Sequence, residues 1–375
     1  MKEKISIIGV GRLGLTFALL VDEKGYDVCG CDVNEPYIKS LQEKTFVSKE
    51  PHVTDLLKQS SIKFTNDTIE ALNHSSVIFL FVPTPSLTSG EYNHQYIEQV
   101  VAEIENNKIT SKTIMIGCTV MPGYCKSLQE KLSKLNIIVI YNPSLISQGE
   151  IVNGLKNADI IITGGKIPKV VYDLYVAIMG KTPIFKALSL TGAEIAKISI
   201  NCFLTTKIAY ANRIGEICIN SGLWNEVDEI LNAIGSDRRI GNEFLKYGFG
   251  FSGVCLPRDN RALGLHACEV GISPKLQSYI DAINGEHLKY LYDHFVSKNK
   301  NRKLPFIFYQ LSYKKGVDIL TESQPLRLCL MFLENGFNVN IVESDAVIEM
   351  AKDILKPYEN QITYSKEMAG IKIEF

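Results

Sequence analysis

The sequence predicts an α/β protein that begins with a doubly wound parallel sheet and continues into a helical segment. Short apolar runs alternate with helix-like segments through the first half of the chain, which is the pattern of repeated βαβ units. From Thr191 to about residue 291 this alternation gives way to helical periodicity. With 375 residues, the chain is long enough for two or three domains.

The N-terminal sheet is expected to start with a strand over 5–8, followed by a helix over 15–23 that Gly25 ends. A second strand over 27–31 ends at Asp32. Further strands are expected at 77–82, 113–118, 137–141 and 160–163, and helices at 96–106 and 123–135. We place the end of this domain at residue 190.

The segment 191–298 is expected to form a central helical domain. Thr191 and Glu194 have the spacing of a helix N-cap with a carboxylate three positions on. A long helix is predicted from there to Asn220, with Gly222 ending it. After a charged linker at 299–303, a short third domain is expected over 299–375, with its strands and helix at 304–311, 325–333 and 338–343.

The composition excludes several classes of function. The formal net charge of -1 gives no reason to expect nucleic acid or an anionic membrane as a partner. Nine cysteines without a Cys-x-x-Cys pair, and six scattered histidines, predict no metal site and a reducing, cytoplasmic location. No stretch approaches the roughly 20 apolar residues of a membrane span, and glycines interrupt the apolar N-terminal run, which argues against a signal peptide.

A glycine-rich turn follows the first expected strand. Its Gly-x-Gly-x-x-Gly spacing lies between a strand and a helix, with an aspartate about 20 residues further on, which is the full context of a Rossmann dinucleotide site. The aspartate would accept hydrogen bonds from ribose hydroxyls and repel a 2′-phosphate, which favours NAD over NADP. A purely structural turn is the alternative. The residues expected to bind the cofactor here are Gly9, Val10, Gly11, Arg12, Leu13, Gly14 and Asp32.

A second group of residues has the types needed for covalent chemistry. Lys197 and Asn201 are four residues apart and share one helical face, although a solvated polar stripe would have the same spacing. Cys255 lies in a glycine-rich segment, four residues before Asp259. Basic neighbours would favour its thiolate.

These segments resemble the UDP-glucose/GDP-mannose dehydrogenase family. The family signature Gly-Phe-Gly-Gly-Ser-Cys-Leu-Pro-Lys-Asp corresponds to residues 250–259 here, and Ala-Glu-x-x-Lys-x-x-x-Asn corresponds to 193–201. The resemblance extends to about residue 345 and implies a shortened, Rossmann-like third domain, which in typical members continues through a further strand and helix.

The resemblance implies an NAD-dependent, four-electron oxidation of the C6 hydroxyl of a nucleotide sugar. Lys197 and Asn201 would line the site, with Lys197 polarising the developing oxyanion. Asp259 would act with Lys197 and a water in the first proton removal. Cys255 would trap the aldehyde as a thiohemiacetal that becomes a thioester.

Two further turns match the family at the carboxyl ends of strands. Val82-Pro-Thr-Pro85 matches Val-Pro-Thr-Pro, and 118–123 matches Ser-Thr-Val-x-Pro-Gly. They add Val82, Pro83, Thr84 and Thr119 to the expected cofactor contacts. Thr119 would also help to position the hydrolytic water.

The chain departs from the family where thioester hydrolysis is concerned. The family reads Asn-Pro-Glu-Phe-Leu-x-Glu-Gly where residues 142–149 carry Ser144 and Gln148 in place of the two glutamates. Because a serine hydroxyl is a poor general base, we expect hydrolysis to be slower by about 10²–10⁴-fold. Thr321 stands where the family has a cofactor-contacting arginine. By position, Ser144, Leu145 and Ile146 would contact substrate and Gln148 the cofactor.

The substrate segment 235–246 is similar to that of the UDP-glucose branch, so UDP-glucose is the best single expectation. The resemblance implies a homodimer in which Arg239 reaches the neighbouring subunit's site. Alternatives are another UDP- or GDP-sugar, a two-electron 3-hydroxyacid dehydrogenase, and a catalytically silent nucleotide-sugar-binding protein. Besides Lys197 and Asn201, the expected substrate contacts are Arg239, Phe244, Lys246, Phe251, Gly253 and Lys314.

Overall fold

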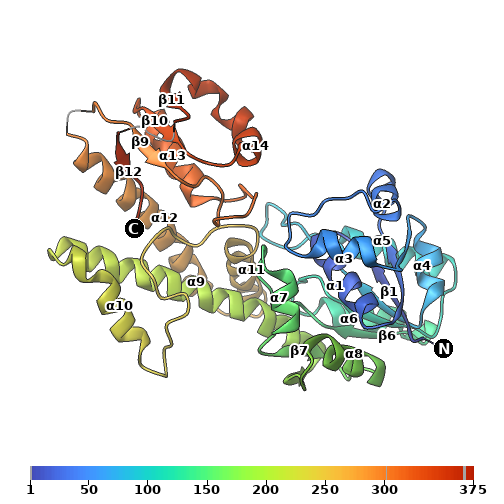
Figure 1. Cartoon of the computed structure of the whole chain (residues 1–375). Helices are drawn as coiled ribbons and strands as arrows, with labels where there is room; N and C mark the ends of the chain where they lie inside the picture. Colours follow the sequence, from blue (N-terminus) through green and yellow to red (C-terminus); the bar gives the residue numbers. More distant parts are fainter. Residues whose placement is uncertain (1, 301, 366–368) are drawn as a thin grey trace. The chain divides into compact units, whose positions relative to one another are not determined.

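The computed structural model describes residues 2–300, 302–365 and 369–375, and the chain divides into two compact units, Met1–Ile198 and Ser199–Phe375 (Figure 1). Asn301, inside the linker expected at 299–303, is outside the described residues. Among the described residues, no helix is long and apolar enough to cross a membrane. The same residues contain no group of three or more His, Cys, Asp or Glu side chains placed to hold a metal ion.

An eight-stranded sheet with the order β3-β2-β1-β4-β5-β6-β7-β8 organises the first unit. Its strands are β1 (Lys4–Ile8), β2 (Asp27–Cys31), β3 (Lys63–Thr65), β4 (Val77–Leu80), β5 (Thr113–Ile116), β6 (Ile138–Tyr141), β7 (Ile161–Gly164) and β8 (Phe185–Leu188). From the central strand β1, the chain adds β2 and β3 on one side and β4 to β8 on the other. This order confirms the doubly wound fold.

Neighbouring strands of this sheet are parallel except β6 and β7, which pair antiparallel at Tyr141 and Gly164. A wholly parallel sheet was therefore the wrong expectation for that pair. The connection between the two strands carries only the six-residue helix α7 (Ile151–Lys156), and β7 starts at the edge where β6 ends. Strands β3 and β8 were not expected from the sequence, because both are short and β8 is mostly exposed.

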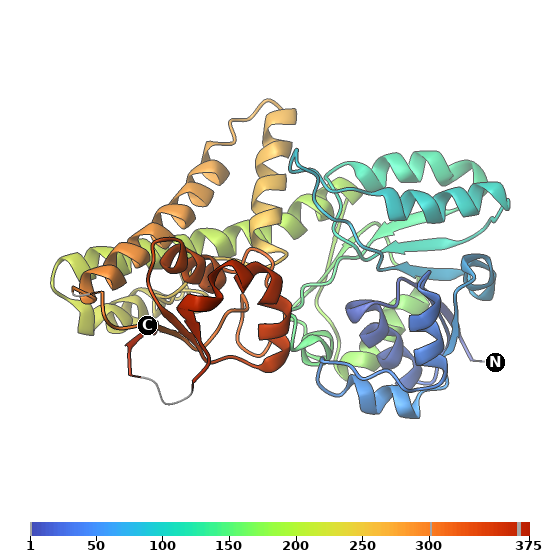
Figure 2. The ribbon, with the colours of Figure 1, turned by 90° about the horizontal axis from the view of Figure 1, so that it is seen from above.

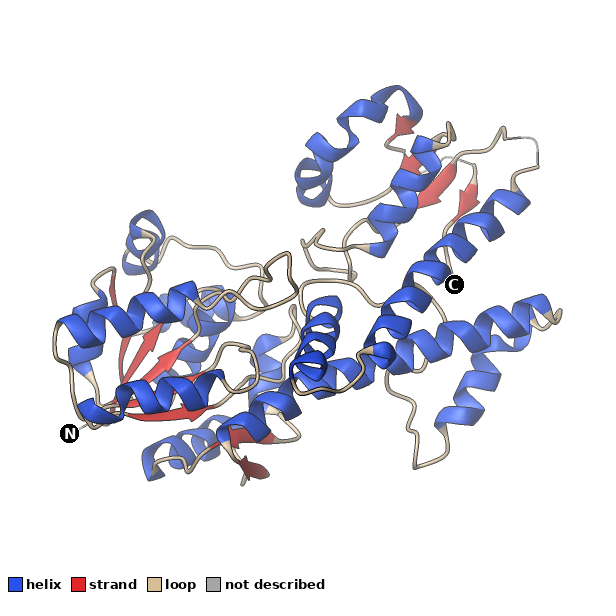
Figure 3. Cartoon of the chain, turned by 180° about the vertical axis from the view of Figure 1, so that it is seen from behind, coloured by secondary structure: helices blue, strands red, loops and turns tan. Residues whose placement is uncertain are grey.

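Helices cover both faces of the large sheet (Figure 3). Phe17 of α1 and Phe79 of β4 lie in its main apolar core, with ring centroids 4.8 Å apart. Besides α7, the helices of the unit are α1 (Arg12–Glu23), α2 (Glu35–Gln42), α3 (Val53–Gln59), α4 (Thr68–His74), α5 (Gln95–Asn106), α6 (Tyr124–Leu132), η1 (Ser133–Leu135) and α8 (Lys169–Met179).

The long helix α9 (Leu190–Asn220) runs from the first unit into the second. The second unit adds η2 (Trp224–Glu226), α10 (Val227–Gly235), α11 (Leu256–Glu269), α12 (Lys275–Lys298), α13 (Gln324–Glu334), α14 (Asp345–Leu355) and η3 (Lys356–Gln361). Its parallel sheet has the order β11-β10-β9-β12, formed by β9 (Phe306–Phe308), β10 (Val339–Ile341), β11 (Ile362–Thr363) and β12 (Ile371–Lys372).

The small sheet shares a core with the helices that precede it in the chain. Phe295 of α12, Phe308 of β9 and Phe332 of α13 belong to one buried cluster, and α12 contacts α13 (Figure 2). The rings of Phe306 and Phe332 stack with centroids 3.8 Å apart. The two segments expected as separate domains therefore form one compact unit, and a division at residue 298 stays a prediction.

Candidate functional site

The turn after β1 is shaped by its glycines. Gly9 has a φ of +91°, a backbone conformation that residues other than glycine rarely adopt. A Cβ on Gly14 would lie 2.0 Å from the Gly9 carbonyl oxygen, so the third glycine allows α1 to pack against the turn. A Cβ on Gly11 would meet nothing within 4 Å. Gly11 therefore faces open space at the N-terminus of α1, and this cradle fits a dinucleotide pyrophosphate.

The other fingerprint residues divide by exposure. Val10 is fully buried, so any cofactor contact of this residue would come from its backbone, whereas Leu13 is half-buried and packs on the core. Asp32 follows β2 and is partly exposed; its carboxylate accepts a 3.1 Å hydrogen bond from the Asn34 N–H. An acceptor at the end of β2 suits ribose hydroxyls.

The turns after β4 and β5 are joined by a hydrogen bond. The Thr84 hydroxyl donates to the Thr119 carbonyl at 2.7 Å, and Thr84 is buried while Thr119 is half-buried. The structure thus brings together two residues that sequence reasoning assigned to the cofactor. Of the flanking residues, Val82 is half-buried and Pro83 is exposed.

Glu194 has a different role from the one expected. Helix α9 begins one residue before Thr191, and the Ser189 hydroxyl accepts the Gly192 N–H at 3.1 Å, so Ser189 is the cap and the proposed Thr191 cap is wrong. The fully buried Glu194 carboxylate instead accepts the N–H groups of Gly123 at 2.6 Å and Cys125 at 2.7 Å. It caps α6 and fixes the turn that starts at Thr119.

His94 supports the same turn from α5, and sequence reasoning missed it. Its Nε2 accepts the Met121 N–H at 3.3 Å, and its ring stacks on Tyr124 with centroids 3.9 Å apart. Burial lowers the pKa of His94 below 6.5, and the accepted hydrogen bond requires the neutral ring.

Arg12 and Gln148 connect the fingerprint turn to the 142–149 loop. The guanidinium of Arg12 donates to the Gln148 Oε1 at 3.3 Å. The buried Glu50 accepts from the Gly149 N–H at 2.8 Å and lies 3.9 Å from Arg12. Glu50 was missed because an isolated glutamate before a proline carries no signal of its own.

The rest of that loop is anchored by Asn142. Its amide donates to the Ile162 carbonyl at 3.1 Å and accepts from the Tyr175 hydroxyl at 2.6 Å. Burial raises the pKa of Tyr175, so its hydroxyl stays protonated as the donor. The expected substrate residues Ser144, Leu145 and Ile146 follow this anchor and are all half-buried.

Cys255 occupies the N-cap position of α11 in the second unit. Its thiol is exposed, whereas seven of the nine cysteines are buried. An exposed cysteine at a helix N-terminus is in a position typical of reactive cysteines. Cys268, the other exposed cysteine, lies at the far end of the same helix.

Asp259 lies one turn after Cys255 and has no exposed surface. Its Oδ2 accepts from the Asn201 amide at 2.6 Å, and its Oδ1 accepts from the Arg258 Nε at 3.3 Å. The structure therefore joins two of the predicted catalytic residues, Asn201 and Asp259. Lys197 is buried one helical turn before Asn201 in α9.

The loop before Cys255 is held from two sides. Gly253 has a φ of +82°, and a Cβ there would lie 2.5 Å from the Tyr313 ring. The Phe251 carbonyl accepts from the Asn284 amide at 2.9 Å, while its side chain is 2% exposed and packs against Ala209 and Ile280. The Phe251 ring thus anchors the loop in the apolar cluster with Ala209 and Ile280. A contact between this ring and the sugar stays a prediction.

The remaining substrate residues lie at the surface of the second unit. Arg239, Phe244 and Lys246 are exposed, and Lys314 is half-buried. The Arg239 guanidinium is held by Asp237, with an Nη2–Oδ2 distance of 2.6 Å.

Comparison with known proteins agrees with this geometry. Residues 3–179 match the NAD binding domain, and residues 191–286 the central domain, of the UDP-glucose/GDP-mannose dehydrogenase family. A UDP-glucose 6-dehydrogenase of Bacillus subtilis is 28% identical over 92% of this chain and 77% of its own length. A GDP-mannose 6-dehydrogenase of Pseudomonas savastanoi is 27% identical over 91% and 81% of the two chains. The solved UDP-glucose dehydrogenase of Pyrobaculum islandicum shares the fold, with a TM-score of 0.86, 21% identity, and coverage of 98% and 87%.

Proposed function

The chain belongs to the UDP-glucose/GDP-mannose dehydrogenase family of NAD-dependent nucleotide-sugar 6-dehydrogenases, and we propose that its substrate is UDP-glucose and its product UDP-glucuronate. The similarity of segment 235–246 to the UDP-glucose branch favours this substrate. The hydrogen bond between Asn201 and Asp259, one turn from the exposed Cys255, is the observation that carries the four-electron oxidation. A two-electron dehydrogenase has no use for a nucleophilic thiol beside that pair.

The fingerprint turn would hold NAD with its pyrophosphate at Gly11 and the N-terminus of α1, and with its ribose hydroxyls on Asp32. Bound NAD supplies hydride acceptance, once for each of the two oxidations. The other polar contacts proposed for NAD come from Thr84, Thr119, Arg12 and Gln148.

In the first oxidation, the C6 hydroxyl gives its proton to a base and its carbon loses hydride, which leaves an aldehyde. Asp259 is the proposed base, and because it has no exposed surface it acts through Lys197 and a water. Lys197 stabilises the negative charge that develops on the C6 oxygen, and Asn201 adds a neutral hydrogen bond.

In the second oxidation, the Cys255 Sγ bonds to the aldehyde carbon, and the carbonyl oxygen takes up a proton. Loss of a second hydride from this thiohemiacetal, with its hydroxyl proton, gives a thioester. Water then adds to the thioester carbon, the C–S bond breaks, and the carboxylate leaves with the thiol restored. The last step lacks the family glutamate at position 144, so it is the slow one.

A homodimer fits the exposed apolar side chains of α9. Phe203, Tyr210 and Ile217 recur every seven residues and are 64%, 52% and 54% exposed. Arg239 is exposed and would have to exchange its ion pair with Asp237 for contacts in a second copy. The nine cysteines form no disulfide, which favours the reducing cytoplasm as the location.

An assay with excess NAD and limiting UDP-glucose tests the proposal by counting NADH per sugar. Two NADH per sugar supports complete oxidation. A burst that stops near two per active site supports the thioester and places the block at hydrolysis. If UDP-glucose yields no NADH, the same assay is run with GDP-mannose and other UDP-sugars. NADH formation with one of these identifies it as the substrate in place of UDP-glucose. If none of them yields NADH, the result favours a nucleotide-sugar-binding protein without catalytic activity.

A further inference from the structure

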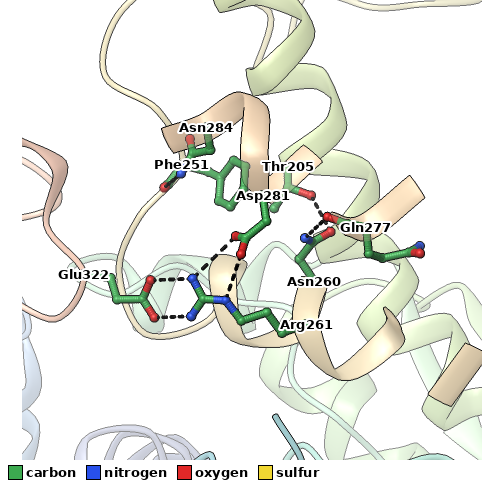
Figure 4. Close-up of polar contacts among 8 residues, drawn as sticks. All are labelled: Thr205, Phe251, Asn260, Arg261, Gln277, Asp281, Asn284 and Glu322. Atoms are coloured by element: carbon green, nitrogen blue, oxygen red, sulfur yellow. Dashed lines mark hydrogen bonds and ion pairs between the residues drawn. The ribbon is translucent and has the colours of Figure 1, made fainter. Parts of the chain in front are cut away.

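Arg261 lies on α11, two residues after Asp259, and joins two carboxylates from other parts of the second unit (Figure 4). Its Nε and Nη2 donate to Asp281 of α12 at 3.1 and 3.4 Å. Its Nη1 and Nη2 donate to Glu322, in the turn before α13, at 2.7 and 3.0 Å. Two paired contacts on one guanidinium are the geometry in which an arginine ion pair is strong.

The backbone at Glu322 shows that this turn is held in place. Glu322 has a φ of +47°, a left-handed conformation that costs free energy in a residue other than glycine. The next residue, Ser323, caps α13 by accepting the Leu326 N–H at 3.3 Å, and its hydroxyl donates to the Leu311 carbonyl at 2.5 Å. The turn is therefore tied to α11 through Glu322 and, through Ser323, to Leu311 in the loop that follows β9.

Three consecutive residues of α11 bind other elements of the second unit, and both Asn260 and Arg261 contact α12. Asp259 accepts from Asn201 of α9. Asn260 has no exposed surface and donates to the Gln277 carbonyl of α12 at 2.9 Å. Arg261 alone connects α11 with the turn at Glu322 (Figure 4) among the contacts described for these three.

We propose that Arg261 is a positioning residue that fixes the Cys255 helix against the segment 311–324, so that the thiol and Lys314 are held in one frame. The inference rests on the roles proposed for Cys255 and Lys314. Loss of the guanidinium removes the ion pair between α11 and the turn at Glu322. It also leaves the carboxylates of Asp281 and Glu322 without the cation between them, and their repulsion pushes the turn away from α12, against which α11 packs. The loosened helix no longer holds Cys255 in the ordered position at its N-terminus, which lowers the reactivity of the thiol.

Alkylation of the free protein by iodoacetamide, followed by peptide mass spectrometry, tests this without any ligand. In Arg261→Gln, we expect the rate at Cys255 to fall at least threefold relative to the rate at Cys268, which serves as the internal reference on the same helix. Arg261→Lys keeps the positive charge but loses the paired hydrogen bonds. Its Cys255-to-Cys268 alkylation ratio should therefore lie between those of the wild type and Arg261→Gln. Labelling of the seven buried cysteines would report unfolding instead of repositioning.

The matched control is Arg213→Gln. Arg213 is as exposed as Arg261, at 42% against 44%, and pairs with Glu216 and Glu286, but it does not lie on α11. The control should leave the Cys255-to-Cys268 ratio unchanged. An unchanged ratio in folded Arg261→Gln overturns the proposal.

Turnover gives a second readout. With the nucleotide sugar, kcat of Arg261→Gln should fall about tenfold while KM changes less than threefold, because the sugar still binds but its C6 is displaced from the thiol. A rise in KM with kcat intact also overturns the proposal. If the wild type reduces no NAD with any sugar, the proposed function fails, and the alkylation ratio decides the role of Arg261 by itself.

Discussion

The side-chain amide of Asn201 donates a 2.6 Å hydrogen bond to the buried carboxylate of Asp259. The bond crosses from α9 to α11 and connects a residue expected to bind substrate with one expected to move its proton. It also keeps Asp259 a hydrogen-bond acceptor.

Asn201→Ala should therefore impair both stability and turnover. The buried carboxylate loses one donor, which costs about 1–3 kcal/mol of unfolding free energy, and we expect kcat to fall about 10²-fold. Urea unfolding and steady-state kinetics measure the two effects. Asn201→Asp, which places a second carboxylate there, should be worse in both; equal activity of the three proteins would contradict the pairing.

Gly11 and Gly14 should respond to alanine in opposite ways. Gly11→Ala points its methyl group into open space, so unfolding should change by less than about 1 kcal/mol while NAD binds at least tenfold more weakly. Gly14→Ala forces a methyl group to 2.0 Å from the Gly9 oxygen and should cost about 3 kcal/mol or more. Thermal unfolding with an NAD titration distinguishes them, and an unstable Gly11→Ala would refute the cradle.

Ser144→Glu should restore fast thioester hydrolysis. A carboxylate at this position is able to activate water, which general-base catalysis typically rewards with 10²–10⁴-fold. In wild-type protein quenched during turnover, intact-mass analysis should find an acyl adduct on Cys255, and in the variant this adduct should be depleted as steady-state NADH production rises. Absence of the adduct from the wild type would rule out slow hydrolysis. The control is Ser147→Glu, at an exposed position of the same loop. It should change neither the amount of acyl adduct nor the steady-state rate of NADH production.

Acid should destabilise the turn at Met121 through His94. The pKa of His94 in the fold is lowered from 6.5 by burial, so the unfolded chain takes up this proton first as the pH falls. The stabilisation is present above pH 6.5 and is lost as the pH falls below that value. Chemical unfolding at pH 7.5 and 5 measures the free energy of unfolding at each pH. Between these values the wild type should lose more unfolding free energy than His94→Gln, whose amide accepts the same hydrogen bond without titrating. Equal losses would show that His94 is uncoupled from acid unfolding.

Local sequence rules located six of the eight strands of the large sheet, because these are short apolar runs between turn signals. They placed β1, β2 and the long helix α9 within a few residues. They missed the three-residue β3 and the mostly exposed β8. They also missed the reversal at β7, because strand direction depends on where a connection returns to the sheet. The Thr191 cap failed for a similar reason: Glu194 fits a local motif, but two N–H groups of α6 compete for its carboxylate.

By itself, the sequence determined the dinucleotide turn, the four-residue spacing of Lys197 and Asn201, and the cysteine segment ending at Asp259, because each is a short pattern with its own backbone requirement. Only the tertiary structure decided that Asn201 meets Asp259 and that Glu50, His94 and Arg261 hold the surrounding turns. These contacts join residues distant in the chain, and no local pattern specifies a partner that only packing brings within hydrogen-bonding distance.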